Sequence, residues 1–373
     1  MEPKKVEVCY NVPMEDLSLI CLSSFKERGK AVEAWIKKER NQPDANYILD
    51  ISQVRFSNGE GKIILNQTAR GKDVYILADV GNYSCTYKMF GADNRMSPDD
   101  HFQDIKRAVS AASRRSRRIT VIMPLLYASR QHRRMSRESL DCAVALQELE
   151  RMGVARVVTF DAHDPNIVNA IPLSSFDNAS PTYSIISAFA KSQAGKIDKD
   201  NTIVISPDYG AMGRAIKVAT ILGLDVGIVY KRRDYSTIIK GSHPIIGFAY
   251  TGPEVKGKSV IVVDDMIASG KSILEVATHL KKQGVGDITV FTSFALFNEG
   301  TSEFDKLYKD GIIKSVYSTN LSYLSEEVKN REWFHKVDLT PHIAKIINAL
   351  NNDKSIAPHI ENFEDLNKLL DKG

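Results

Sequence analysis

The stretch V-I-V-V-D-D-M-I-A-S-G-K-S-I, residues 260–273, indicates both a fold class and a binding site. Its four β-favouring apolar residues predict a buried strand, and two adjacent carboxylates, Asp264 and Asp265, stand where that strand should end. A short loop at residues 266–271 should follow, and the apolar spacing beyond it predicts a helix that starts near Ser272. A buried strand that leads through a loop into a helix is typical of parallel α/β proteins.

The same stretch predicts a binding site for ribose 5-phosphate. Loop N–H groups and the helix N-terminus would hold the phosphate dianion, while the two carboxylates accept hydrogen bonds from sugar hydroxyls or hold a metal that does. A Walker A loop would need a glycine five positions before Gly270, where this chain has Asp265, whose charge would repel a triphosphate. The remaining alternative is an ordinary strand end with solvated aspartates and a serine-capped helix.

The composition is that of an ordinary globular protein. The chain has 373 residues, 43% hydrophobic and 26% charged, which is enough for two domains and a full core. The net charge of +4 is mild, but nine arginines and no acid fall between Arg107 and Arg137. Nucleic acid or polyphosphate ligands could use such a stretch, although a solvated basic face is the commoner outcome. Tyr127 is its only aromatic residue, and we expect no nucleic-acid partner.

Cysteine usage and hydropathy favour a cytoplasmic protein. None of the four cysteines has a C-x-x-C spacing, so neither a zinc site nor a disulfide framework is indicated, and reduced thiols fit best. The N-terminal sequence M-E-P-K-K-V-E-V has no apolar signal core, and the longest apolar runs are too short to span a membrane. We therefore expect no membrane partner.

Strand-like and helix-like segments alternate along most of the chain, which predicts mainly parallel sheets flanked by helices. The strand candidates are residues 47–54, 74–77, 119–123, 156–160, 202–205, 226–230, 260–263 and 289–295. The helix candidates are residues 101–113, 136–152, 182–192, 211–222, 272–283 and 341–350. The polar stretch at 174–181 predicts a break between two α/β domains.

Polar clusters follow several of the expected strands. In an open α/β sheet, ligands bind beyond the carboxyl ends of the strands. The clusters are R-Q-H-R-R at 130–134, F-D-A-H-D at 160–164, S-P-D-Y-G-A at 206–211, K-R-R-D at 231–234 and the acidic stretch at 264–272. Together they supply cations for phosphate and oxygens for a metal.

In this order, the clusters resemble the ribose-phosphate pyrophosphokinases, or phosphoribosyl pyrophosphate synthetases, from about Arg55 to Ala357. That family has two tandem phosphoribosyltransferase-like domains, and with magnesium it transfers the diphosphoryl group of ATP to the C1 hydroxyl of ribose 5-phosphate, feeding nucleotide biosynthesis. The resemblance implies an N-terminal domain with an ATP loop at 1–178 and a C-terminal domain with the ribose 5-phosphate site at 179–337. Residues 338–373 would form a helix and tail that pack back on the N-terminal domain.

The resemblance also implies an ATP site. The stretch R-F-S-N-G-E, residues 55–60, looks like the family's adenine loop and is called the nucleotide loop below. Phe56 would stack on the base, and Asn58 and Glu60 would hydrogen-bond its edge, usually across a subunit contact. Arg130 and Gln131 match the family's ATP-binding pair. On the residues alone, the Asn-Gly pair predicts a hairpin turn, and both readings can hold.

The remaining clusters match residues that handle the metal and the transferred group. His163 and Asp208 correspond to magnesium-associated residues of the family. Lys231 and Arg233 correspond to cations of a mobile loop, which would neutralise the charge that develops on the transferred phosphoryl group. A surface histidine and a basic turn are the plainer readings of the same residues.

The stretch 264–272 matches the family's ribose 5-phosphate site and is called the sugar-phosphate loop below. The residues expected to bind are Asp264, Asp265, Ser269, Gly270, Lys271 and Ser272. Ala268 stands where the family usually has a third acid, and Lys271 where a small residue is common. Lys271 could add a cation beside the 5-phosphate, and activity should persist because phosphoryl transfer relies mainly on positioning and charge neutralisation.

Two alternatives to an active enzyme remain open. A catalytically silent regulatory paralogue is favoured by Ala268 and Lys271 but not by the retained His163, Asp208 and basic cluster. A phosphoribosyltransferase would share the sugar-phosphate loop but would need no ATP loop. The resemblance further implies a homo-oligomer, and the segment 84–99 looks like an added loop that fits the family pattern poorly.

Overall fold

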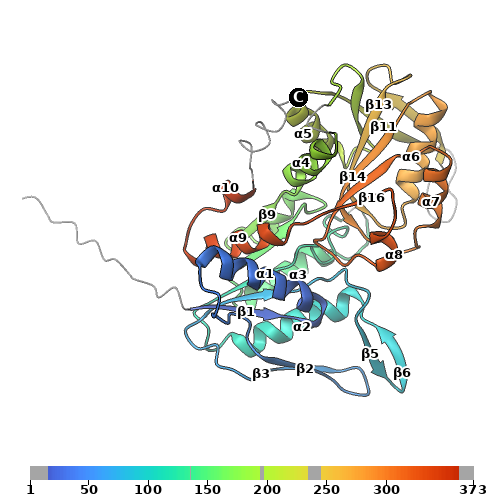
Figure 1. Ribbon diagram of the computed structural model, residues 1–373. Helices are drawn as coiled ribbons and strands as arrows, with labels where there is room; N and C mark the ends of the chain where they lie inside the picture. Colours follow the sequence, from blue (N-terminus) through green and yellow to red (C-terminus); the bar gives the residue numbers. More distant parts are fainter. Residues whose placement is uncertain (1–15, 135, 194–196, 234–244, 361–373) are drawn as a thin grey trace, which may run out of the picture.

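The computed structural model describes residues 16–134, 136–193, 197–233 and 245–360. Two large sheets, each flanked by helices, form two domains that lie one above the other in Figure 1. The first sheet uses strands from the N-terminal half of the chain and the second uses strands from the C-terminal half. The predicted fold class, mainly parallel sheets flanked by helices in two tandem domains, is therefore confirmed.

The first sheet has five strands in the order β1-β4-β7-β8-β9, and all neighbouring pairs are parallel. Its strands are β1 (Leu17–Cys21), β4 (Asp73–Leu77), β7 (Arg118–Ile122), β8 (Arg156–Phe160) and β9 (Ser175–Ala179). The central strands are buried because helices cover the sheet, so they read as nearly continuous apolar runs.

The second sheet has seven strands in the order β12-β11-β10-β13-β14-β15-β16. Its strands are β10 (Thr202–Ser206), β11 (Asp225–Arg233), β12 (Ile245–Thr251), β13 (Ser259–Ile267), β14 (Ile288–Ala295), β15 (Ser315–Thr319) and β16 (Phe334–Val337). All pairs are parallel except the edge pair β11–β12, which is antiparallel. The strand that carries the sugar-phosphate loop, β13, lies in the middle of this sheet.

The helices cover both faces of the second sheet. The helices of the described chain are α1 (Lys26–Arg40), α2 (Pro98–Ala112), α3 (Asp141–Arg151), α4 (Thr182–Ser192), α5 (Met212–Leu222), α6 (Lys271–Lys282), α7 (Ser302–Lys309), α8 (Glu326–Lys329), α9 (Thr340–Asn351) and α10 (Ala357–Ile360), with short 3-10 turns at Ser23–Phe25 and Pro165–Ala170. Ile261 and Val263 of β13 pack with α4 and α5 into a core that is continuous with the first domain. Val260 and Val262 face the other way and pack with α6 and α7.

Two small antiparallel sheets lie outside the large ones. One pairs β2 (Ile51–Arg55) with β3 (Gly61–Leu65) and carries the nucleotide loop at its turn. The other pairs β5 (Thr86–Met89) with β6 (Ala92–Arg95), so the added segment 84–99 contains a hairpin. Among the described residues, no helix has the length and apolar character needed to cross a bilayer.

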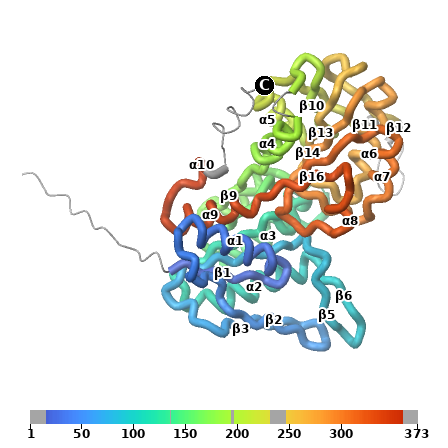
Figure 2. The backbone as a smooth tube through the Cα atoms, viewed as in Figure 1, coloured from blue at the N-terminus to red at the C-terminus, as the bar shows by residue number. Residues whose placement is uncertain are grey.

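After the second sheet, the described chain returns to the first domain through helix α9. Helix α9 packs against α1, as the tube in Figure 2 also shows. The side chain of Asp73 in β4 is completely buried and accepts hydrogen bonds from Arg118 at 2.7 Å and from Asn351 at 2.9 Å. Arg118 also donates to the carbonyl oxygen of Leu350 at 2.9 Å. Helix α9 is therefore tied to the strands β4 and β7 of the N-terminal sheet.

The boundaries around the acidic pair differ from the sequence-based expectation. Strand β13 does not end at Asp264 but continues to Ile267, because Met266 and Ile267 still pair with the long buried strand β14. The connecting loop therefore contains only residues 268–270, and the helix begins at Lys271. In the same way β11 runs on to Arg233, because the antiparallel strand β12, which was not predicted, pairs with it.

Two other elements differ from the expected secondary structure. The polar stretch 174–181, for which no strand was expected, contains the strand β9, an edge strand whose polar side chains are tolerated because one side of it faces no further strand. Helix α3 begins at Asp141 instead of Ser136, because the preceding polar residues bond locally: the Ser136 N–H donates to the Glu138 carboxylate at 3.2 Å.

Candidate active site

The turn from β13 into α6 is short and closely packed. Gly270 caps the helix with a φ of +81°, a conformation that favours glycine. A side chain at this position would also collide with the ring of Phe304 in α7. The sequence therefore needs a glycine here to bring the chain straight from the strand into the helix. The N–H groups of Ser272 and Ile273 in the first helical turn, which have no acceptor within the helix, are then available to an anion.

The polar residues predicted for phosphate binding all lie in this turn. Ser269 and Ser272 are half-buried, and Lys271 is exposed. The Ser269 hydroxyl accepts the backbone N–H of Lys271 at 3.4 Å. The structure thus places two residues with hydroxyl groups and one cationic residue at the start of α6, and groups of these kinds can bind a phosphate.

The two acidic residues occupy different environments. Because side chains alternate along a strand, Asp264 and Asp265 lie on opposite faces of β13. Asp264 is half-buried and lines a small cavity of about 20 Å³. Burial, the charge of Asp265 and the charge of Asp208 raise the pKa of Asp264 well above its usual value. Asp264 is therefore a carboxyl group that gains from a cation or a hydrogen-bond donor.

Asp265 is bonded to the first domain. Its Oδ2 atom lies 2.7 Å from Nδ1 of His163, which follows the end of β8. Burial alone would raise the pKa of Asp265, but the hydrogen bond from His163 and the charge of Arg214 hold it below its usual value. An ionised Asp265 accepts a hydrogen bond from Nδ1–H, and in a neutral His163 ring this leaves Nε2 as the accepting nitrogen.

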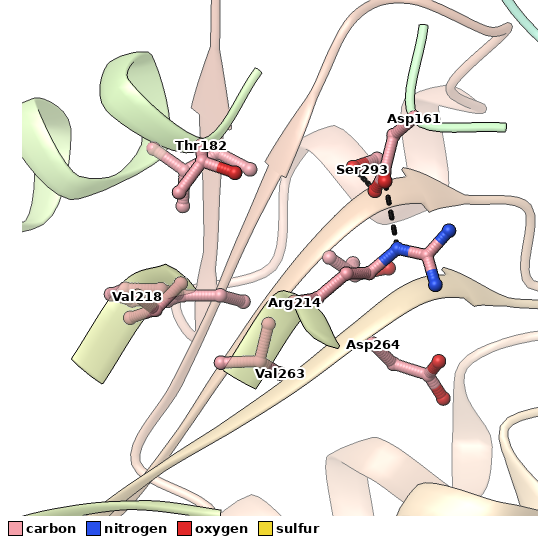
Figure 3. Close-up of a pocket in the computed structure, with 10 residues that line it drawn as sticks. Asp161, Thr182, Arg214, Val218, Val263, Asp264 and Ser293 are labelled. Carbon is pink, nitrogen blue, oxygen red and sulfur yellow. Dashed lines mark hydrogen bonds and ion pairs between the residues drawn. The ribbon is translucent and has the colours of Figure 1, made fainter. Parts of the chain in front are cut away.

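An arginine joins the same two domains. Arg214, from the start of α5, donates through Nε to Asp161 at 2.7 Å and through Nη2 to the carbonyl oxygens of Ala162 and His163 at 2.7 and 3.2 Å. The Ser293 hydroxyl of β14 donates to the other oxygen of Asp161. Burial raises the pKa of Asp161, and the charge of Arg214 opposes that rise. In the view of Figure 3, the Arg214 guanidinium lies between the carboxyl groups of Asp161 and Asp264.

A larger cleft of about 530 Å³ opens beside this cluster. It is lined from the first domain by His132, Arg133 and His163, and from α5 by Arg214 and Lys217. The rings of His132 and His163 are 5.4 Å apart. The cleft is therefore rich in nitrogen groups that could face phosphates, next to the acidic pair on β13.

The residues predicted for ATP lie at the surface. Asn58 and Glu60 bond each other across the turn at 3.0 Å, and Phe56 exposes 48% of its surface. The hairpin turn at the Asn-Gly pair is confirmed, with Gly59 at a φ of +92°. Arg130 and Gln131 are also exposed, and the cleft is lined by their neighbours in the same cluster.

Of the remaining predicted residues, the structure describes the side chain of Asp208 but not those of Lys231 and Arg233. Asp208 follows β10, is exposed, and accepts the N–H of Ala211 at 3.1 Å. No three His, Cys, Asp or Glu side chains form a ready-made metal cage within the described ranges. Lys231 and Arg233 form the end of β11, and their side chains lie outside the described residues.

Sequence reasoning assigned no role to Asp161, which stands in the cluster at 160–164, or to Arg214, which lies three residues beyond the cluster at 206–211. The available signal was a charged residue within one such cluster and another just after a second cluster. Their ion pair joins residues 53 positions apart, so it depends on how the two domains pack and not on a local pattern.

Comparisons with known proteins agree with this architecture. Residues 30–153 match the N-terminal domain of ribose phosphate pyrophosphokinase, and residues 174–324 match the phosphoribosyl transferase domain. The fold resembles the crystal structure of phosphoribosylpyrophosphate synthetase from Mycobacterium smegmatis with a TM-score of 0.74, at 21% identity, over 91% of this chain and 99% of that one. The two tandem domains thus have the phosphoribosyltransferase-like fold.

Curated relatives are similar over most of their length. The ribose-phosphate pyrophosphokinase of Haemophilus influenzae is 30% identical over 83% of this chain and 90% of that protein. The protein of the same name from Pasteurella multocida is 29% identical over the same shares. On these matches, the chain belongs to the ribose-phosphate pyrophosphokinase family.

Proposed function

We propose that the chain carries out its family's reaction where the two domains meet. It is a ribose-phosphate diphosphokinase, which transfers the diphosphoryl group of ATP to the C1 hydroxyl of ribose 5-phosphate and yields phosphoribosyl pyrophosphate and AMP. The observation that carries the location is the 2.7 Å contact between His163 and Asp265, because it joins the end of β8 to the sugar-phosphate loop.

Ribose 5-phosphate would bind along the sugar-phosphate loop. The 5-phosphate would accept hydrogen bonds from Ser269, Ser272 and the N–H groups that start α6, with Lys271 as a nearby cation. Gly270 would let the chain approach the phosphate closely. Asp264 would accept hydrogen bonds from the sugar hydroxyls, and Asp265 would hold His163 with Oδ2 and offer its other oxygen to the sugar.

The oxygen and nitrogen atoms at this site are suitable ligands for magnesium. Mg²⁺ is usually bound through one or two carboxylates together with substrate phosphates, so an all-protein cage is not required. We assign its protein contacts to Asp208 and to Nε2 of His163, directly or through water, and the charge of Asp208 also acts on Asp264. When bound, the ion would neutralise charge on the phosphate oxygens.

The chain's own groups would do the rest of the work on ATP. Phe56, Asn58 and Glu60 would hold the adenine, and Arg130 and Gln131 would bind the nucleotide from the cluster that precedes α3. Lys231 and Arg233 would neutralise the charge of the transferred diphosphoryl group, which is the main task of a protein in phosphoryl transfer.

We also propose a cytoplasmic homo-oligomer. The described cysteines Cys21, Cys85 and Cys142 are free thiols, which fits a reducing compartment. The exposed Phe56 on the nucleotide loop fits an adenine site shared with a second copy. Light scattering of the purified chain at several concentrations tests this, since a monomer throughout would contradict it.

A phosphorus NMR assay of the purified chain tests the reaction. With ATP, ribose 5-phosphate and magnesium, the spectrum should gain the signals of AMP and of phosphoribosyl pyrophosphate, and chelation of the metal should stop the reaction. Formation of ADP in place of AMP would exclude diphosphoryl transfer. Intact ribose 5-phosphate binding without turnover would instead indicate the silent regulatory subunit, which Ala268 and Lys271 favour.

A further inference from the structure

The added segment at 84–99 forms a regular hairpin instead of a loose loop. Strands β5 and β6 pair antiparallel in register from Thr86–Arg95 to Met89–Ala92. The turn between them has positive φ at both central residues, 50° at Phe90 and 80° at Gly91, which suits a tight hairpin. The backbone of Met96 donates to Cys85 at 2.8 Å, so the ends of the hairpin lie side by side.

One face of this hairpin lies against the nucleotide loop. Along β5, Thr86 and Lys88 are exposed, whereas Tyr87 and Met89 are half-buried. The sulfur of Met89 is packed against Gly59, where an added Cβ would lie only 2.6 Å away. The ring of Tyr87 lies 5.0 Å from the guanidinium of Arg55, at the base of the loop. The buried face of the hairpin is therefore the face that contacts this loop.

A backbone hydrogen bond fixes the two turns to each other. The N–H of Phe90 donates to the carbonyl oxygen of Ser57 at 2.8 Å, so the tip of one hairpin is bonded to the tip of the other. Within the nucleotide loop, Gly59 donates to Phe56 at 2.9 Å and Phe56 to Glu60 at 2.8 Å. In Figure 1 the hairpins β2–β3 and β5–β6 approach each other at the lower right of the first domain.

We infer that the hairpin β5–β6 is a positioning element for ATP, which holds the nucleotide loop in one conformation without contacting the substrate. The inference rests on the proposed role of Phe56, Asn58 and Glu60 in adenine binding. A loop already ordered before it binds loses less conformational entropy on binding, so its support raises affinity. The hairpin should therefore affect the KM for ATP and spare the sugar-phosphate loop in the other domain.

Two neighbouring side chains on opposite faces of β5 give a matched test. Met89→Ser removes the contact with Gly59 and should raise the KM for ATP about tenfold, with the KM for ribose 5-phosphate and kcat changed by no more than about twofold. Lys88→Ser alters only the exposed face and should leave all three constants unchanged. An equal KM for ATP in these two variants would overturn the inference.

Removal of the hairpin gives a second, catalysis-independent readout. Because Cys85 and Met96 are already hydrogen-bonded, Asn-Gly can replace residues 86–95 as a two-residue turn. The KM for ATP should rise at least as much as in Met89→Ser, and the amide of Gly59 should exchange with solvent faster than in the intact chain. Unchanged exchange at Gly59 would show that the hairpin does not hold the loop.

Phe56→Ala separates this inference from the proposed function. If Phe56→Ala raises the KM for ATP while both hairpin variants behave as the intact chain, the nucleotide loop keeps its assignment and the positioning role is overturned. If Phe56→Ala leaves that KM unchanged, the assignment of the loop fails, and the positioning role fails with it.

Discussion

The sugar-phosphate loop and the nucleotide loop are held in place in different ways. The first continues a buried strand between β10 and β14, so its position follows from the core of the second domain. The second lies on a two-stranded sheet and depends on the hairpin β5–β6 and on the bond between Arg55 and Asp104 of α2. A change in the first loop should therefore affect stability and binding together, and a change in the second should affect binding alone.

The largest expected effect lies in neither loop. We expect the two loops to bind the substrates and the cations Lys231 and Arg233 to act on the reaction step. Lys231→Ala and Arg233→Ala should therefore each lower kcat by roughly a hundredfold or more, because each removes a charge that matters mainly in the transition state. Steady-state kinetics with both substrates would measure this. Arg232→Ala, a neighbouring cation without an assigned role, is the control, and a full kcat in the two test variants would refute their role.

The nucleotide loop should show an effect on binding alone. Phe56→Ala should raise the KM for ATP by about five- to a hundredfold, the range expected for loss of stacking on a base, and leave the KM for ribose 5-phosphate nearly unchanged. Ile64→Ala on β3, an apolar residue that is 40% exposed, is the matched control on the same small sheet. A lower melting temperature with unchanged kinetics would mean that Phe56 serves only packing.

The sugar-phosphate loop should combine both effects. Gly270→Ala should lower the free energy of unfolding by about 1–2 kcal/mol more than Gly257→Ala and should also raise the KM for ribose 5-phosphate. Both glycines have positive φ, but an added Cβ at Gly270 would meet Phe304, whereas no atom lies within 4 Å of one at Gly257. Denaturant unfolding of both variants measures the cost of the clash with Phe304. Equal losses in the free energy of unfolding would contradict this clash.

The smallest expected effect concerns the buried carboxyl group of Asp73 in the first sheet. Burial alone would raise the pKa of Asp73, but bonds from Arg118, Asn351 and Tyr75 hold it below its usual value of 3.8. A lowered pKa contributes stability above about pH 4 that is lost as the pH falls below it, with a slope of at most about 1.4 kcal/mol per pH unit. Asp73→Asn should make the free energy of unfolding depend less on pH in this acidic range. An unchanged dependence would mean that groups other than Asp73 cause the acid sensitivity.

The sequence was sufficient for most strands that are buried and continuous, although the buried strand β1 was missed. The runs at 156–160 and 260–263 were found because strands covered on both faces are apolar throughout. The edge strand β9 and the helix α1 were missed, because the first is polar and the second begins with a long charged stretch. The strand extensions to Ile267 and Arg233 depend on partner strands that a local pattern does not contain.

The candidate site was predictable to a similar extent. Contiguous motifs located the sugar-phosphate loop and the Asn-Gly turn, since their backbone geometry depends on glycines in fixed places. The contact between His163 and Asp265 spans 102 positions in the sequence, and the pair of Arg214 with Asp161 spans 53, so both required the packed domains. The magnesium ligands and the boundary between the domains stay predictions.

The return of α9 to the first domain has a consequence for the order of events during protein synthesis. The ribosome completes the strands β1, β4 and β7 long before it makes Leu350 and Asn351, which bond to Arg118 and Asp73. Until then the nascent N-terminal half must leave a buried aspartate without one of its donors and expose the apolar surface that Ile343 and Ile347 later cover. A nascent chain that stops between the two domains would therefore expose apolar surface of an incomplete first domain, and chaperones bind such surface.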